Sequence, residues 1–219
     1  MDRSKAGLDG DVIEELDEAT GLLLAALEAA GLAEDTWVIF TSDNGPWLSK
    51  GDAGGHALPL RSGKGTVFEG GMRVPCIMRW PGRIPAGSVC EEIASTLDLL
   101  PSIAYELGVT PKNEVDGSPL QSLLLGEQRE DSFAYLYYNV TGKPVALRVD
   151  NWKLIFDVPV GGTAESHEKL KYAGGLSEPE LYDLRNDPGE KINLANQFPS
   201  RIVKMKKRAV EITARIEHD

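Results

Sequence analysis

The stretch VIFTSDNGP, residues 38–46, decides the fold. It begins with β-branched and aromatic residues, which favour a buried strand over residues 36–40, and it ends in turn-forming residues. Residues 9–30 precede it and carry apolar side chains at three- and four-residue intervals, the pattern of an amphipathic helix. Because a helix followed by a short, continuously apolar strand is typical of a sheet covered by helices, we predict an α/β fold.

The pattern changes near residue 130. Before it we predict a second strand over residues 74–81 and a helix over 95–108, in which Pro101 indicates a bend or a late start. After it, alternating apolar runs separated by turns predict a small antiparallel sheet, and a closing helix is expected over 199–216. We therefore expect two domains, residues 1–130 (α/β) and 131–219 (α+β), with a flexible insertion over 161–177.

Composition excludes some classes of function. The formal net charge of −11 argues against a nucleic-acid-binding protein, which needs a basic face. No apolar run reaches about 18 residues, so no membrane span is predicted. The two cysteines, Cys76 and Cys90, show no C-x-x-C spacing, which gives no support for a zinc or redox site.

Asp43 and Asn44 are the first candidate functional residues. They follow the predicted strand 36–40, and ligands of parallel sheets bind at the carboxyl ends of strands. A carboxylate and a carboxamide oxygen are hard ligands that suit Ca²⁺ or Mg²⁺. The competing interpretation is an ordinary turn, because Asp-Asn-Gly-Pro favours turns for local reasons.

Residues 44–65 form a Gly-rich loop with two further candidates. Lys64 stands between two glycines, where its ammonium group is free to meet a tetrahedral anion, although a solvated loop lysine is the plainer interpretation. His56 is a candidate acid/base or substrate contact, or else an exposed histidine without a role.

Taken together, these segments resemble the C-terminal half of a type I sulfatase, that is, of the formylglycine-dependent arylsulfatase family in the alkaline-phosphatase-like superfamily. The resemblance covers nearly the whole chain. It rests on the order and spacing of six segments: EELDEATGLLLAALEAAGLAEDTWVIFTSDNGP, PLRSGKGTVFEGGMRVPCIMRWPGRIPAG, STLDLLPSIAYELGV, DGSPLQSLLLGE, NWKLI and ELYDLRNDPGEKINLA. It implies a mixed sheet between helices, followed by a smaller antiparallel sheet with a helix.

The resemblance also implies roles for the candidates. Asp43 and Asn44 correspond to two ligands of the family's Ca²⁺, with Mg²⁺ as the alternative cation. Lys64 corresponds to the lysine that binds the substrate sulfate. His56 stands at a variable position, where a substrate contact is a hypothesis. The implied substrate is a small aryl or carbohydrate sulfate.

The family's nucleophile is a formylglycine made from Cys or Ser in a C/S-x-P/A-x-R motif, and neither Cys76 nor Cys90 begins one. We therefore expect the nucleophile, the remaining metal ligands and an acid/base histidine in an N-terminal half that partners this chain. No catalytic residue is assigned in this chain, because the nucleophile is expected upstream. The chain alone is expected to be inactive and poorly soluble. The family implies a periplasmic, lysosomal or secreted location, and this sequence carries no address of its own.

The sequence leaves two alternative functions open. Phosphate or phosphonate ester hydrolases share the superfamily scaffold, and a Thr or Ser nucleophile upstream would favour them. A degenerate domain that only binds a partner or a carbohydrate would retain metal binding without hydrolysis.

Overall fold

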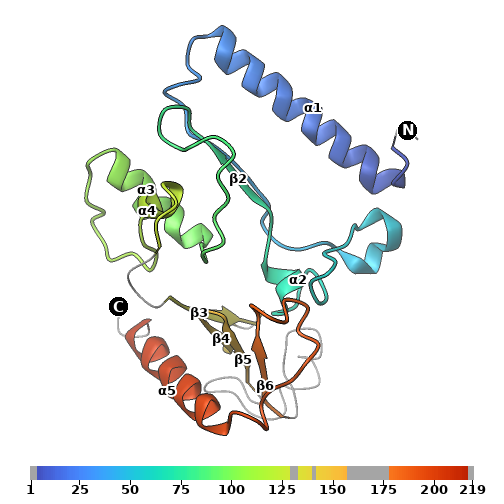
Figure 1. The fold of residues 1–219 in the computed structure, drawn as a ribbon, viewed down its shortest axis with the longest axis vertical. Helices are drawn as coiled ribbons and strands as arrows, with labels where there is room; N and C mark the ends of the chain where they lie inside the picture. Colours follow the sequence, from blue (N-terminus) through green and yellow to red (C-terminus); the bar gives the residue numbers. More distant parts are fainter. Residues whose placement is uncertain (1–3, 129–132, 140–141, 157–177, 217–219) are drawn as a thin grey trace. The chain divides into compact units, whose positions relative to one another are not determined.

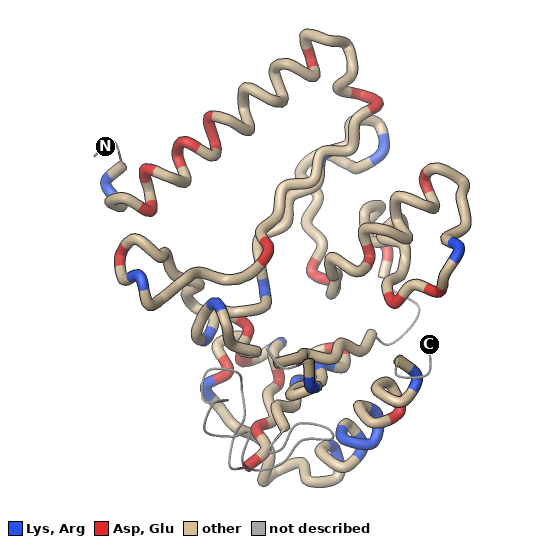
Figure 2. The backbone as a smooth tube through the Cα atoms, turned by 180° about the vertical axis from the view of Figure 1, so that it is seen from behind, with Lys and Arg blue, Asp and Glu red and all other residues tan. Residues whose placement is uncertain are grey.

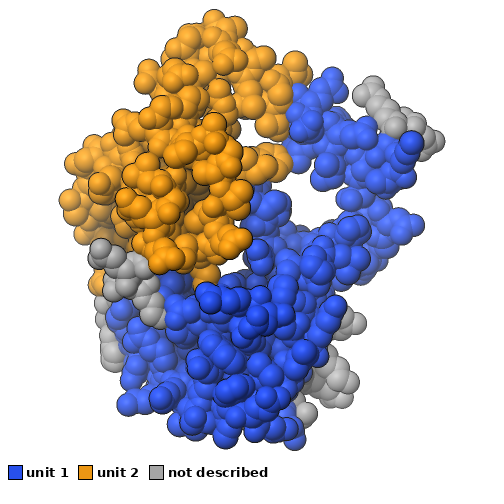
Figure 3. Space-filling model, in the orientation of Figure 1, with its two compact units in different colours: residues 1–18, 41–76, 133–219 blue, residues 19–40, 77–132 orange. Residues whose placement is uncertain are grey.

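The computed structural model describes residues 4–128, 133–139, 142–156 and 178–216. The chain divides into two compact units (Figure 3). One unit comprises residues 1–18, 41–76 and 133–219, and the other comprises 19–40 and 77–132. Segments 41–76 and 133–219, which are far apart in the sequence, thus belong to one compact unit. The domain boundary near residue 130 stays a prediction.

The N-terminal elements follow the sequence pattern. The predicted first helix is α1 (Gly7–Ala29), and the two predicted strands are β1 (Val38–Thr41) and β2 (Cys76–Arg79), which pair in a two-stranded sheet (Figure 1). Both strands are shorter than expected. The loop predicted over residues 44–65 contains a 3-10 segment, η1 (Leu48–Ala53), and a single helical turn, α2 (Glu69–Met72), comes before β2.

The helix predicted over residues 95–108 has a late start. A 3-10 turn, η2 (Thr96–Asp98), comes first, and Ser95 and Asp98 close it with a reciprocal capping box. The α-helix α3 (Leu99–Glu106) then places Pro101 in its first turn, where no backbone donor is needed. A short helix, α4 (Gln121–Leu124), follows.

The C-terminal part contains the predicted antiparallel sheet. It has four strands in the order β3 (Ala134–Tyr138), β4 (Pro144–Val149), β5 (Trp152–Ile155) and β6 (Glu180–Asp183). Strand β6 was not predicted. The closing helix α5 (Pro199–Ile216) lies against the sheet, and Met205 and Ala209 are buried there (Figure 1). The insertion predicted over residues 161–177 lies outside the described residues.

The apolar stripe of α1 is not covered. None of its residues is buried, and Val12, Ile13 and Leu23 are each more than half exposed. Acidic residues gather in the first half of the same helix, between Asp9 and Glu18, whereas Lys and Arg line α5 (Figure 2). Among the helices of the described residues, none combines the length and apolar character needed to cross a bilayer.

A buried ion network joins α2 to the C-terminal sheet. The Lys153 ammonium lies 3.0 Å from the carboxylate of Glu69 and 2.9 Å from that of Glu190, and all three side chains are at most 2% exposed. Arg148 Nη1 lies 3.1 Å from the second oxygen of Glu69, and the Glu69 backbone N–H donates to Glu190 at 2.7 Å. Burial raises the pKa of the Glu190 carboxyl, and the Lys153 charge opposes that rise. The network keeps these charges paired inside the protein.

Lys153→Met is expected to lower the free energy of unfolding by about 3–5 kcal/mol, because it leaves two buried carboxylates without their shared cation. Urea unfolding measures this loss. The matched control is Lys207→Met, since Lys207 is exposed and forms only a 3.9 Å surface pair with Glu211. That control is expected to change stability by less than about 0.5 kcal/mol. Equal small losses for both variants would show that the network does not hold the unit together.

Candidate functional site

Asp43 and Asn44 lie where the sequence places them, directly after β1. The Ser42 hydroxyl donates to the backbone carbonyl of Asn44 at 3.1 Å, which tightens the turn. The Asn44 side-chain amide donates to the Asp43 carboxylate. Asp43 is exposed and Asn44 is half-buried, so the two polar groups meet at the surface.

Asp43 and Asn44 fit the implied divalent cation in part. One carboxylate and one carboxamide oxygen, adjacent on one turn, have the right chemistry for Ca²⁺ or Mg²⁺. They supply only part of the six to eight oxygens that Ca²⁺ prefers. Within the described ranges, no group of three or more His, Cys, Asp or Glu residues could complete a site. Asp43 and Asn44 therefore fit as a partial ligand set, and their metal role stays a prediction.

The turn that carries Asp43 and Asn44 is bonded to the loop that carries Lys64. The Gly45 N–H donates to the Gly71 carbonyl at 3.0 Å, and the Lys64 N–H donates to the Pro46 carbonyl at 2.9 Å. A Cβ on Gly63 would lie 2.5 Å from the same Pro46 oxygen, so the backbones are in close contact. The structure thus brings the segments of the acid–amide pair and of the lysine side by side.

The side chain of Lys64 is exposed and lies over an aromatic ring. Its ammonium is 5.3 Å from the centre of the Trp47 ring, and that of Lys50 is 4.7 Å from the same ring. Trp47 directly follows the DNGP turn. Lys64 is therefore placed as an accessible cation, and its role in binding sulfate stays a prediction.

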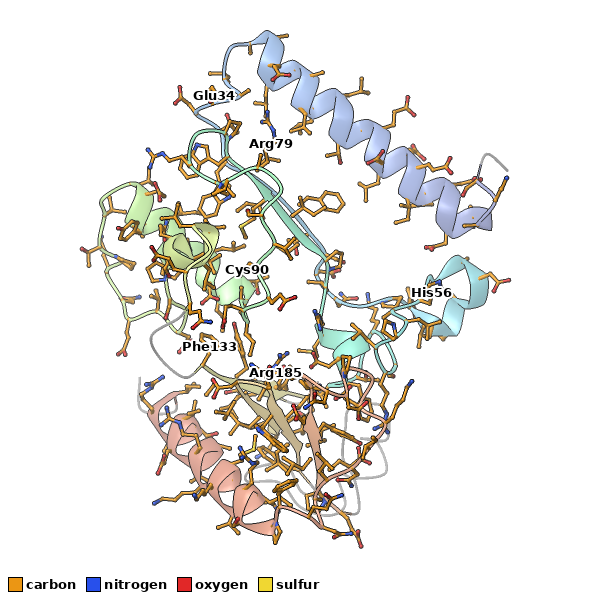
Figure 4. All side chains as sticks on the ribbon, viewed as in Figure 1. Glu34, His56, Arg79, Cys90, Phe133 and Arg185 are labelled. Atoms are coloured by element: carbon orange, nitrogen blue, oxygen red, sulfur yellow. The ribbon has the colours of Figure 1, made fainter. Side chains whose placement is uncertain are left out.

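His56 lies in the loop after η1 and is exposed (Figure 4). Within the described part of the chain it forms no hydrogen bond or ion pair. The substrate contact predicted for it stays a prediction.

The residues that support the site were missed by sequence reasoning. Arg61 pairs with Glu180 at 3.2 Å and packs 3.7 Å over the Phe68 ring. Glu69 pairs with Lys153 and Arg148, as described above. A lysine among apolar residues in the strand pattern WKLI was the one available signal for a buried charge.

The two cysteines are free and exposed. Partial burial raises the pKa of the Cys76 thiol, and a hydrogen bond with Thr41 opposes this in part. A thiol with a raised pKa is a poor nucleophile at neutral pH.

Comparison with known proteins identifies relatives over the whole described chain. The family model "Sulfatase" matches residues 4–109, and the model "N-sulphoglucosamine sulphohydrolase, C-terminal" matches residues 62–215. Arylsulfatase A of Homo sapiens is 42% identical over 205 residues, which cover 88% of this chain and 40% of that protein. This chain thus spans about two fifths of that curated relative's length.

Solved structures show the same fold. PsFucS1 sulfatase from Pseudoalteromonas sp. is 26% identical with a TM-score of 0.74, over 94% of this chain and 42% of that one. The phosphonate monoester hydrolase of Agrobacterium radiobacter is 24% identical with a TM-score of 0.63, over 93% and 40%. The predicted fold class, a partial alkaline-phosphatase-like α/β domain with a smaller antiparallel sheet and helix, is confirmed.

Gly45→Ala tests the contact between the two loops. An added Cβ would lie 1.8 Å from the Gly70 carbonyl oxygen, so the turn must move away from α2. We expect a loss of about 1–3 kcal/mol in thermal unfolding, together with a shifted Lys64 amide resonance.

The matched control for Gly45→Ala is Gly21→Ala in α1, where no heavy atom lies within 4 Å. Alanine favours a helix over glycine by about 1 kcal/mol, so this variant is expected to be at least as stable as the parent chain. An unperturbed Lys64 amide in Gly45→Ala would contradict the loop contact.

Proposed function

Because this chain belongs to the sulfatase family, we propose that it supplies the C-terminal part of a sulfuric ester hydrolase, including part of its metal site and its anion-binding lysine. The observation that carries the proposal is the pairing of the two loops. Two backbone hydrogen bonds, Gly45 to Gly71 and Lys64 to Pro46, hold the Asp43–Asn44 turn beside the Lys64 loop.

The chemistry of these residues suits sulfuryl transfer. Negative charge develops on the oxygens of the transferring group and on the leaving oxygen, and fixed positive charge stabilises it. Lys64 binds one of these oxygens with its ammonium. Asp43 and Asn44 would hold the divalent cation, which supplies Lewis-acid stabilisation when bound. Both cations also offset the chain's net charge of −11, which otherwise repels an anionic substrate.

The rest of the catalytic apparatus lies, in this proposal, in an N-terminal part. No C/S-x-P/A-x-R motif occurs in the sequence, so the formylglycine nucleophile is not supplied by these 219 residues. The uncovered apolar side chains of α1, among them Val12, Ile13 and Leu16, provide a surface that such a part would bury. The substrate is a small aryl or carbohydrate sulfate.

A phosphonate or phosphate ester hydrolase is the second candidate. The structural similarity to the phosphonate monoester hydrolase favours it only at the level of the fold, at 24% identity. A formylglycine motif in the upstream sequence supports the sulfatase, whereas a Thr or Ser nucleophile there supports the phosphatase.

The proposal is tested by hydrolysis of an aryl sulfate in the presence of Ca²⁺. The purified chain is expected to show no turnover, and the protein that joins it to its upstream part is expected to be active. In that protein, Lys64→Ala should lower kcat/KM by about a hundredfold, the size typical of losing one charge-stabilising donor. Asp43→Ala should raise the Ca²⁺ concentration required for half-maximal activity.

The matched control is Lys204→Ala, which removes an exposed lysine of α5 and should leave kcat/KM within about twofold. Turnover by the chain alone that disappears in Asp43→Ala or Lys64→Ala would overturn the assignment of the nucleophile to an upstream part. Ca²⁺ binding without hydrolysis in the joined protein would support a binding domain instead.

A further inference from the structure

Trp47 is exposed yet held in place by its own loop. Trp47, which directly follows the DNGP turn, is 51% exposed as a residue. Its backbone N–H donates to the Gly54 carbonyl at 3.0 Å, and its carbonyl accepts from the Lys50 N–H at 2.9 Å. A Cβ on Gly54 would lie 2.0 Å from the Trp47 carbonyl oxygen, so this close return of the loop requires glycine. A large apolar ring is thereby presented to solvent on a fixed backbone.

Two ammonium groups lie on this one ring. Lys50 Nζ is 4.7 Å and Lys64 Nζ is 5.3 Å from the ring centre, so the two nitrogens are separated by no more than the sum of these distances. Among the residues that the structure describes, neither forms an ion pair with a carboxylate. Both are therefore available to anions, in a chain that is acidic as a whole.

The contact between a lysine and an exposed indole is weak and easily exchanged. An anion that reaches Lys64 or Lys50 offers a stronger, charge-assisted partner and draws the ammonium from the ring. The face of the indole is then free to stack on a sugar or aryl ring. Two cations over one aromatic side chain match a ring that carries two anionic groups.

We propose that Trp47 and Lys50 form a substrate subsite beside Lys64, which takes the ring of the sulfate ester and a second anionic group on that ring. This inference rests on the proposed function, in which Lys64 binds the sulfate that is removed. The substrate class is then narrower than a simple aryl sulfate: a sulfated sugar or aromatic ring with a second sulfate or a carboxylate.

The experiment titrates the full 219-residue chain, observed by the NMR signals of the Trp47 indole and the Lys64 amide. Three probes add one feature at a time: inorganic sulfate, phenyl sulfate and 4-carboxyphenyl sulfate. In the parent chain we expect each added feature to tighten binding by about threefold, a factor typical of one exposed stacking or charge contact. Lys64→Ala should weaken the binding of all three probes.

The subsite variants separate the two added features. Trp47→Ala should abolish the gain from inorganic sulfate to phenyl sulfate, and Trp47→Phe should restore part of it. Lys50→Met should abolish only the gain from phenyl sulfate to 4-carboxyphenyl sulfate. The control Lys204→Ala should bind all three probes as the parent chain does.

The outcomes distinguish the two proposals. No binding of any probe, or no effect of Lys64→Ala, overturns the anion-binding role of Lys64 and the subsite with it. Normal weakening by Lys64→Ala, combined with parent-like affinities in Trp47→Ala and Lys50→Met, overturns the subsite alone. Equal losses for all three probes in Lys50→Met would likewise overturn it, because they indicate a general effect on the loop.

Discussion

The buried ammonium of Lys153 is the interaction on which the unit of residues 1–18, 41–76 and 133–219 depends. It lies between the carboxylates of Glu69 and Glu190, and the three side chains are too buried for water to solvate their charges. Charges in such a setting are tolerated only while they are paired and hydrogen-bonded. Because Lys153 belongs to β5 and Glu69 to α2, the requirement for pairing ties the segment after Lys64 to the C-terminal sheet.

Backbone contacts connect this ion network to the candidate site. Glu69 is followed by Gly70, whose carbonyl lies so close to Gly45 that a Cβ on Gly45 would be 1.8 Å from the carbonyl oxygen. The Gly45 N–H in turn donates to Gly71, which fixes the end of the DNGP turn. The glycines are needed because two backbones approach each other directly. The position of a surface turn is thus determined by charges buried in the sheet.

The sequence could predict what depends on local pattern. Periodicity located α1 and α5, alternation located β3 to β5, and Pro101 indicated the late start of α3. Strand β6 was missed, because ELYD is short and lies next to a strong turn signal. The pairing of Lys153 with Glu69 and Glu190 could not be predicted, since burial of a charge is decided by tertiary contacts. The contact between the turn after β1 and the Lys64 loop could not be predicted from spacing, because it rests on backbone hydrogen bonds between residues distant in the sequence.

The most direct test of this account is native-state hydrogen exchange of the 219-residue chain, because it measures the opening free energy of single amides. If the ion network holds the site loops to the sheet, the amides of Gly45 and Lys64 should open with free energies within about 1 kcal/mol of that of Phe156, whose N–H bonds to Val145 in the sheet. Exchange of Gly45 and Lys64 at nearly unprotected rates, while Phe156 stays protected, would contradict it.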